Sequence, residues 1–155
     1  GDAKGFILKL DSPKLESGTT DAAPGLLTFP QNTYNGYIQG IYPAFKVQSG
    51  DRFQSIINCE YNATACYVNF RLDYQIGTGA VKTFWSFNER YEGLFYRADL
   101  NLNSLAGQDV KFILRVGAAG YATGDRALWG APRITRPDGT APEEMPVREA
   151  RIDPL

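Results

Sequence analysis

The chain alternates apolar and polar positions with a period of two residues, and no segment shows the 3.6-residue period of an amphipathic helix. The clearest case is residues 66–74, where apolar residues at positions 68, 70, 72 and 74 alternate with polar or aromatic residues at 67, 69, 71 and 73. Residues 94–102 and 110–116 alternate in the same way. Because successive side chains of a strand point to opposite faces, each segment predicts a strand with one buried and one exposed face.

Turn-forming residues separate these segments. Asn35-Gly36 and Gly77-Thr78-Gly79 are examples, since glycine and asparagine tolerate the backbone angles of tight turns. The strands that we predict lie at residues 6–10, 37–42, 44–48, 52–58, 66–74, 81–87, 94–102, 110–116, 125–129 and 133–135. This spacing predicts an all-β fold, an antiparallel β-sandwich of the jelly-roll type with about eight to ten strands. The residues expected to be buried in its core are Val68, Phe70, Leu72, Phe112, Leu114 and Trp129.

The predicted strands divide the chain into three parts. Residues 1–35 hold one strand and a long loop rich in Ser, Thr, Pro and Gly at 11–25, and this part is a candidate interaction arm. Residues 36–136 form the predicted sandwich. Residues 137–155 are rich in proline and charge and have no core of their own, which is typical of an extended tail or linker.

Charge and composition exclude several classes of function. The 155 residues include 16 Lys or Arg, 17 Asp or Glu and no histidine, which gives a formal net charge of −1. Such a chain lacks the positive charge of a nucleic-acid-binding protein, and catalysis or zinc binding through histidine is impossible. The best apolar stretch, 110–119, is interrupted by Lys111 and Arg115 and is too short to span a bilayer. We therefore predict no nucleic-acid partner and no membrane insertion.

Acidic pairs are the only candidate hydrolytic groups. Asp73 with Asp99, or Glu89 with Glu92, offers the two carboxylates that a glycosidase needs. Each has an arginine nearby in sequence or on the same predicted face, so charge pairing across a solvated sheet accounts for it without catalysis. The sequence also lacks a nucleophile elbow, a phosphate loop and a dinucleotide fingerprint. We therefore predict that the protein is not an enzyme.

Cys59 and Cys66 are the only cysteines, and they enclose a six-residue loop between two predicted strands. The spacing suits a local disulfide, which indicates an extracellular or cell-surface location; two buried free thiols are the alternative. Asn62-Ala63-Thr64 within this loop is a glycosylation sequon, so we expect the loop to be exposed and leave its glycosylation open.

Aromatic residues make up 13% of the chain. Those that fall in loops or out of phase with the buried faces are Tyr34, Tyr37, Tyr67, Trp85, Tyr91, Phe95 and Tyr121. A flat ring suits the apolar face of a pyranose, and nearby Arg, Asn and Asp supply directional hydrogen bonds. We therefore predict a carbohydrate site formed by Tyr67, Arg71, Asp73, Trp85, Arg115 and Tyr121. A protein interface or an ordinary wet sheet face would show the same residue types, and both alternatives stay open.

A calcium ion is the one cofactor that the sequence suggests. Asp51 and Asp125 each stand in a Gly-Asp-Arg triplet at a predicted turn, and hard cations held by oxygen ligands often brace the loops of β-sandwiches. An aspartate at such a turn can equally bond its own backbone or pair with an arginine of an adjacent strand.

Two segments carry a resemblance to a known family. Residues 110–116 (Val-Lys-Phe-Ile-Leu-Arg-Val) and 124–134 (Gly-Asp-Arg-Ala-Leu-Trp-Gly-Ala-Pro-Arg-Ile) resemble the closing strands of galactose-binding-like jelly rolls, in particular NPCBM-type carbohydrate-binding domains. Residues 47–53, 66–74 and 100–107 also look like domains that recur in surface proteins of filamentous environmental bacteria. The resemblance covers about residues 36–135. It implies a jelly roll, and it implies that Asp125 and Trp129 organise the core and a turn rather than a ligand.

Two functions follow from these observations. The first is a secreted, non-catalytic sandwich that binds a polysaccharide or glycan at the cell surface or in extracellular matrix. The alternative is a structural subunit of an extracellular sheath, fibre or surface layer, which would form a homo-oligomer or filament through its terminal arms. An accessory domain of a larger secreted protein is compatible with either.

Overall fold

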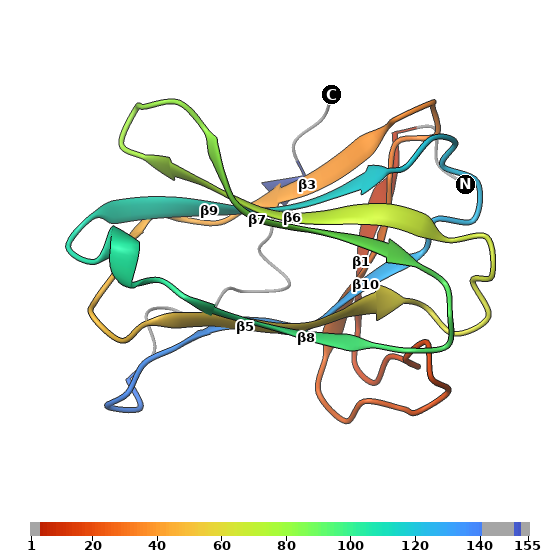
Figure 1. Cartoon of the computed structure of the whole chain (residues 1–155), viewed down its shortest axis with the longest axis horizontal. Coiled ribbons are helices and arrows are strands. Elements are labelled where there is room, and N and C mark those ends of the chain that lie inside the picture. The colour runs from red at the N-terminus through yellow and green to blue at the C-terminus, as the bar shows by residue number, and fades with distance from the viewer. Residues whose placement is uncertain (1–3, 141–150, 153–155) are drawn as a thin grey trace.

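The protein folds as two antiparallel β-sheets packed face to face (Figure 1). The computed structural model describes residues 4–140 and 151–152. The first sheet has the strand order β1 (Phe6–Leu10), β2 (Gly25–Phe29), β10 (Ala127–Thr135), β5 (Arg52–Cys59) and β8 (Tyr96–Asn101). The second has the order β11 (Arg151–Ile152), β3 (Tyr37–Ile41), β9 (Asp109–Ala118), β6 (Tyr67–Ile76) and β7 (Lys82–Arg90), and β4 (Phe45–Lys46) pairs with β9. This confirms the all-β sandwich.

The apolar positions of the alternating segments lie on the inner faces of the two sheets. In β6 the apolar positions 68, 70 and 72 are 0% exposed, and the other predicted core residues are buried as well. Trp129 of β10 lies at the centre, because its ring meets those of Phe53 and Phe70 edge to face at centroid distances of 6.2 and 5.0 Å. Burying such large side chains from both sheets at one place holds the two layers together, at about 1.5–3 kcal/mol for each side chain.

The N-terminal part differs from the prediction, because it is built into the first sheet. All five residues of β2 are buried, and this strand was not predicted. It lies between β1 and β10, and β1 pairs with it along its whole length, from Phe6 opposite Phe29 to Leu10 opposite Gly25. A strand buried on both faces shows a continuous apolar run, so it lacks the alternation of apolar and polar residues from which the other strands were predicted.

The last predicted strands differ in their boundaries. The strands predicted at 125–129 and 133–135 are one strand, β10, interrupted by an irregularity in its pairing with β5 between Gly130 and Arg133. Residues 103–105 form a single 3₁₀ turn, η1 (Asn103–Leu105). Of the predicted tail at 137–155, the structure describes 137–140 and the two residues of β11, which pair with β3; the rest lies outside the described residues. Within the described part of the chain, no helix is long and apolar enough to cross a membrane.

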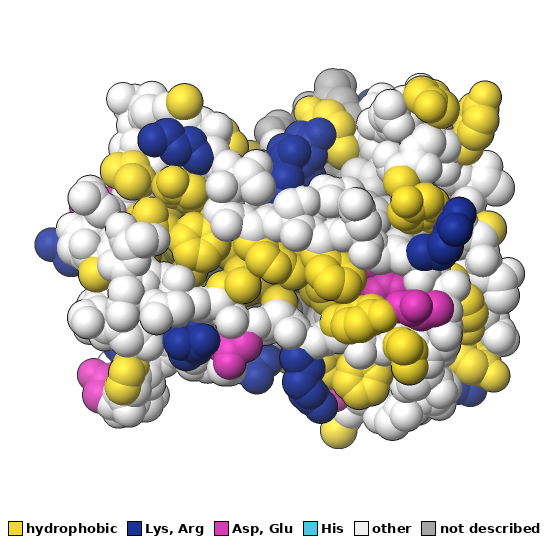
Figure 2. Space-filling view, in the orientation of Figure 1, with side chains coloured by type: hydrophobic (Ala, Val, Ile, Leu, Met, Phe, Trp, Pro, Cys, Tyr) yellow, Lys and Arg dark blue, Asp and Glu magenta, His cyan; other side chains and the backbone are white. Residues whose placement is uncertain are grey.

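The strands β7 and β8 form one open side of the sandwich, because each is the last strand of its sheet. Figure 2 shows a band of hydrophobic side chains across this side, between the two edges. Trp85 and Phe87 of β7 pack against the core from here, with ring centroids 6.1 Å apart, and Phe87 meets Tyr96 of β8 at 5.1 Å. The aromatic contacts thus close the gap between two edges that no backbone hydrogen bond joins in the described strand pairing.

Candidate functional site

Three exposed tyrosines from distant parts of the sequence lie at one end of the second sheet. Tyr34 precedes β3, Tyr121 follows β9, and Tyr67 begins β6; their exposed fractions are 62%, 78% and 38%. The rings of Tyr34 and Tyr121 meet edge to face with centroids 5.2 Å apart. The backbone nitrogen of Ala119, two residues before Tyr121, donates to the carbonyl of Tyr67 at 3.1 Å. We call these three residues the tyrosine rim.

Backbone hydrogen bonds hold the loops of the rim to one another. The Asn35 nitrogen donates to the Gly120 carbonyl at 2.7 Å, and the Gly120 nitrogen donates to Asn35 Oδ1 at 3.1 Å. Asn35 has a φ of 56°, and a Cβ on Gly36 would lie 2.0 Å from the Gln31 carbonyl oxygen. The Asn35-Gly36 turn that the sequence predicts is therefore required by the backbone here, and it positions Tyr34 against Tyr121.

Asp125 holds the backbone of Tyr67, one residue of the tyrosine rim, in place. Its Oδ1 accepts a hydrogen bond from the Tyr67 backbone nitrogen at 2.8 Å, and the residue is 1% exposed. Burial raises the pKa of Asp125 to about 6, which the hydrogen bond from Tyr67 opposes. This is a contact that positions Tyr67 and fixes the loop before β10, in keeping with a structural role for Asp125.

The outer face of β6 and β9 carries the predicted polar residues. Arg71 lies opposite Arg115 in the register of the two strands. Arg71 donates to Asp73 through Nε and Nη2 at 3.0 and 2.9 Å, and Asp73 is only 2% exposed. The Arg115 guanidinium lies 3.5 Å from the centre of the Tyr37 ring, and burial, with the nearby charge of Arg71, lowers the pKa of Arg115. Arg71 and Asp73 are thus partners of each other, while Arg115 is stacked on Tyr37.

Gly117 leaves the middle of this face open. It lies opposite Tyr37 of β3 on one side and Asn69 of β6 on the other, and no atom lies within 4 Å of where its Cβ would be. Asn69 donates to Ser86 and Asn88 at 2.8 and 2.9 Å. The result is a polar surface with open space at position 117, which adjoins the tyrosine rim.

Trp85 does not share this surface with the other predicted residues. It packs against the core between the two sheet edges, opposite the buried Leu72. The regular pairing of β6 with β7 explains this, because Trp85 is in phase with Phe87 and stands opposite the inward-facing Leu72. The irregularity at Phe84 lies beyond Trp85 and shifts the pairing only of Thr83 and Lys82. Of the six predicted residues, the structure therefore brings Tyr67 and Tyr121 to the rim, and places Arg71, Asp73 and Arg115 on the adjoining face.

Two further aromatic residues belong to this site. Tyr34 and Tyr37 were recognised as aromatic residues in a loop or out of phase, but they were not assigned to the site. Their signal was the Asn35-Gly36 turn between them, which keeps both rings near the surface. Their neighbours Arg115 and Tyr121 are about 80 residues away in sequence, so only the pairing of β3 with β9 brings them together.

The two aspartates suggested as calcium ligands have protein partners and lie in different surroundings. Asp51 is 0% exposed, and its carboxylate accepts hydrogen bonds from Arg136 Nε and Nη2 at 2.7 and 2.9 Å and from the Gln48 nitrogen at 2.9 Å. Asp125 is bonded to Tyr67 as described above. An aspartate whose oxygens are held by an arginine does not fit a calcium ligand, so the surroundings of Asp51 do not support calcium binding there.

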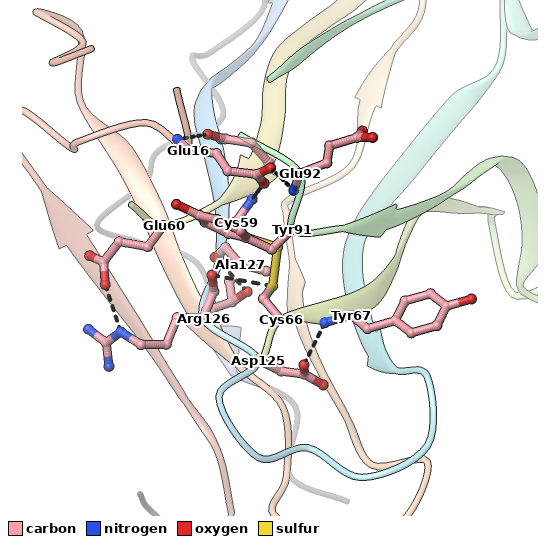
Figure 3. Close-up of a disulfide and its surroundings, with 12 residues drawn as sticks. Glu16, Cys59, Glu60, Cys66, Tyr67, Tyr91, Glu92, Asp125, Arg126 and Ala127 are labelled. Atoms are coloured by element: carbon pink, nitrogen blue, oxygen red, sulfur yellow. Dashed lines mark hydrogen bonds and ion pairs between the residues drawn. A yellow bond between two sulfur atoms is a disulfide. The ribbon is translucent and has the colours of Figure 1, made fainter. Parts of the chain in front are cut away.

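Cys59 and Cys66 form the predicted disulfide, with Cα atoms 6.2 Å apart (Figure 3). It joins the end of β5, in the first sheet, to the residue before β6, in the second. The loop that it closes is largely exposed, including Asn62 of the sequon. Beside it, Arg126 donates to Glu60 at 2.6 Å. The disulfide therefore ties the two layers together directly beneath Tyr67.

A buried acidic pair lies on the other side of the disulfide. Glu16 and Glu89 are each 1% exposed, and with Cys59 they are the one group of metal-ligating residue types within 4.8 Å that occurs in the described part of the chain. The Cys59 sulfur is used in the disulfide. Glu16 Oε1 accepts from the Cys59 nitrogen at 3.0 Å, and Oε2 accepts from the nitrogens of Glu92, Gly93 and Leu94 at 2.6, 2.7 and 3.2 Å. Glu16 thus holds the β7–β8 connection, and the group does not form a metal site.

Comparisons with known proteins support the fold. No family model matches the sequence, and no curated protein matches it. Solved structures do match, among them that of CBM51-2, in complex with GlcNAc, and INT domains from Clostridium perfringens ZmpB, with a TM-score of 0.53 and 15% identity. That match covers 83% of this chain and 27% of the other. Another is TmCBM61 in complex with beta-1,4-galactotriose, with a TM-score of 0.49, 8% identity and coverage of 85% and 88%. The first match shows the β-sandwich fold.

Proposed function

We propose that the protein is a non-catalytic module that binds a glycan at the tyrosine rim. The observation that carries this proposal is the convergence of Tyr34, Tyr67 and Tyr121, which stand far apart in sequence and are fixed by inter-loop hydrogen bonds. Exposed aromatic side chains that stay in place without a ligand lose little conformational entropy when one binds. Rings of this kind stack on the apolar face of a pyranose.

The surface beside the rim supplies polar partners for sugar hydroxyls. Arg90 lies over the ring of Tyr67 at 4.6 Å, and Asn69 and Asn88 follow along the sheet. Gly117 leaves room above the strands for a ring of the ligand. The fold supports the same proposal, because one solved structure similar to it is that of a module in complex with GlcNAc. We place the protein outside the cell, in keeping with its disulfide.

The alternative function, assembly through the terminal arms, has less support. All five residues of β1 are paired with β2, so donating this strand to a neighbour would first break that pairing. Residues 141–150 and 153–155 of the other arm lie outside the described residues.

The test is retention on a panel of insoluble polysaccharides, measured by sedimentation of the pure protein with and without each glycan. We expect the wild type to sediment only with particular glycans, and the variant Tyr34→Ala/Tyr121→Ala to stay in solution with unchanged melting temperature. The matched control is Tyr61→Ala, another exposed tyrosine, whose ring lies under Lys14 instead. Equal retention of the rim variant would place the glycan elsewhere, and sedimentation without any glycan would favour self-assembly.

A further inference from the structure

A cavity of about 370 Å³ lies on the outer face of the first sheet. Its walls come from β5, β8 and β10 and from the loop that contains Asp21. It is therefore separate from the tyrosine rim, which belongs to the second sheet. Its volume falls within the range of small-molecule binding sites.

The backbone of β10 shapes the floor of this cavity. A Cβ on Gly130 would lie 2.8 Å from Ile56 Cβ and 3.5 Å from Asp21 Oδ2, so the position has no room for a side chain. Ala131 then adopts a φ of 45°, a left-handed conformation that is unfavourable for alanine, within the irregular stretch between Gly130 and Arg133. Bulges of this kind change the direction of the side chains that follow them.

Arg133 is held at the cavity by this irregular stretch. Its Nη1 donates to the Ala131 carbonyl at 2.9 Å, and its Nη2 donates to Gln54 Oε1 at 3.3 Å. Both acceptors are neutral. The strained backbone thus turns its own carbonyl toward the guanidinium and fixes it, and no carboxylate of the described residues forms an ion pair with Arg133.

Arg97 supplies a second positive charge to the same cavity. It lies on β8 opposite Ile56 of β5, and its guanidinium is 5.5 Å from the Phe95 ring. Within the described residues, neither Arg97 nor Arg133 forms an ion pair, whereas the other arginine nearby, Arg52, pairs with Asp99 at 2.7 Å. Two guanidinium groups without ion pairs lie on one concave surface, where Asp99 acts on Arg133 only at longer range, and their planar geometry matches a carboxylate.

The acidic residues of the cavity restrict the kind of anion that it can bind. Asp21 and Asp99 both line it, and they would repel a compact, highly charged ion such as phosphate. They would accept hydrogen bonds from hydroxyl groups. Asp21 uses Oδ1 to accept from the Ala23 nitrogen at 3.0 Å, and its Oδ2 faces Gly130. A ligand that carries one carboxylate and several hydroxyls can pair its carboxylate with the two arginines and donate hydrogen bonds from its hydroxyls to the two aspartates.

We propose that this cavity is a second binding site that takes a sugar acid, a uronic acid residue of an acidic glycan. The carboxylate of the sugar lies between Arg97 and Arg133, and its hydroxyl groups face Asp21, Asp99 and Gln54. The site lies on a different sheet from the tyrosine rim, and the inference does not depend on the function proposed for the rim.

The experiment is isothermal titration calorimetry of the full chain at low salt with digalacturonic acid, its dimethyl ester and neutral galactobiose. The ester keeps the shape and hydroxyls of the acid but removes the charges. We expect the acid to bind at least about tenfold more tightly than either uncharged ligand, because hydrogen bonds to charged groups are the strong ones. Equal binding of acid and ester, or no binding of the acid, would overturn the proposal.

Variants test whether the acid binds in this cavity. We expect Arg97→Gln/Arg133→Gln to lose at least about tenfold in affinity for the acid, with an unchanged melting temperature because both side chains are exposed. The matched control is Lys82→Gln, which removes an exposed positive charge from β7 of the other sheet and should bind as the wild type does. Wild-type affinity in the double variant would overturn the assignment, and so would displacement of the acid by an equal concentration of inorganic sulfate. The variant Tyr34→Ala/Tyr121→Ala should still bind the acid, which separates a failure of this proposal from a failure at the rim.

Discussion

The carboxyl groups of Glu16 and Glu89 lie beside each other in the interior, with an oxygen of each within 4.8 Å. Glu16 comes from the long loop after β1, and Glu89 from the end of β7. Four backbone nitrogens donate to Glu16. Neither oxygen of Glu89 accepts a hydrogen bond from the described residues. Burial beside Glu16 therefore favours the protonated form of Glu89 and raises its pKa.

This arrangement predicts that stability falls as the pH rises toward 8. Burial, with the neighbouring charge of Glu16, raises the pKa of Glu89 from 4.5 to about 8. Between these values the folded protein holds a proton that the unfolded chain has released, so the free energy of unfolding decreases with pH and levels off above 8. The variant Glu89→Gln should lose this slope between pH 6.5 and 8.5 in thermal melts. The window avoids Asp125, whose pKa is about 6, and equal slopes for variant and wild type would contradict the prediction.

Glu16 is predicted to be essential for the connection between β7 and β8. Replacing it by alanine leaves the buried nitrogen of Cys59 and those of residues 92–94 without their acceptor. We expect Glu16→Ala to reduce the free energy of unfolding by about 3 kcal/mol or more, as lost hydrogen bonds to a charged group imply. Denaturant titration measures the loss, and hydrogen exchange should show faster exchange at amides 92–94. Glu16→Gln keeps one acceptor oxygen and should lose less; unchanged protection in the alanine variant would count against this role.

The alternation of the sequence predicted the centre of the fold well. Phe70 and Trp129 are in phase with the apolar positions of strands that have one exposed face, so their burial follows from period alone. The same rule fails at β2, where Leu26 and Leu27 are both buried because this strand is covered on both faces. Trp85 follows the rule, because it alternates in phase with Phe87 and both rings pack against the core, although Trp85 was predicted to be out of phase.

The candidate sites were harder to predict, because they depend on which strands are neighbours. The strand pair β3 and β9 brings Tyr34 to Tyr121, and the strand order places Arg97 on the same sheet as Arg133. Neither arginine was among the predicted site residues. Only the backbone at Ala131 and the absence of a carboxylate partner among the described residues distinguish Arg133 from a solvated side chain.

Trp85 is predicted to contribute to stability rather than to ligand binding. Its ring packs against the core and stacks on Phe87, so Trp85→Ala removes apolar contact area at the junction of the two sheets. We expect a loss of about 1–3 kcal/mol in the free energy of unfolding, measured by denaturant titration. The matched control is Tyr121→Ala, which should change stability by less than about 0.5 kcal/mol because its ring is exposed. A Trp85→Ala variant with full stability and lost glycan retention would return Trp85 to the ligand site.

The disulfide is predicted to stabilise the protein by restricting the unfolded chain. Closing a loop of this length is worth about 2.5 kcal/mol in the chain-entropy model, and Cys59→Ala/Cys66→Ala should lose about that amount. Thermal melts of the wild type with and without a reductant test this, and the melting temperature of the alanine variant should not respond to the reductant. A reductant effect of equal size in both proteins would show that the reductant acts elsewhere.

The ion pair of Asp51 with Arg136 is predicted to stabilise the protein, and the same experiment tests whether Asp51 binds calcium. Asp51 is 0% exposed and the Arg136 side chain 9%, so Asp51→Asn leaves a buried guanidinium without its counter-charge. Breaking such a pair costs about 3–5 kcal/mol, and the melting temperature should drop accordingly. Arg136→Gln in the same chain should restore part of the loss, because it removes the uncompensated charge. If Arg136 is the partner of Asp51, both changes in melting temperature should be identical in calcium and in EDTA. If instead EDTA lowers the melting temperature of the wild type but not that of Asp51→Asn, a cation and not Arg136 is the partner of Asp51.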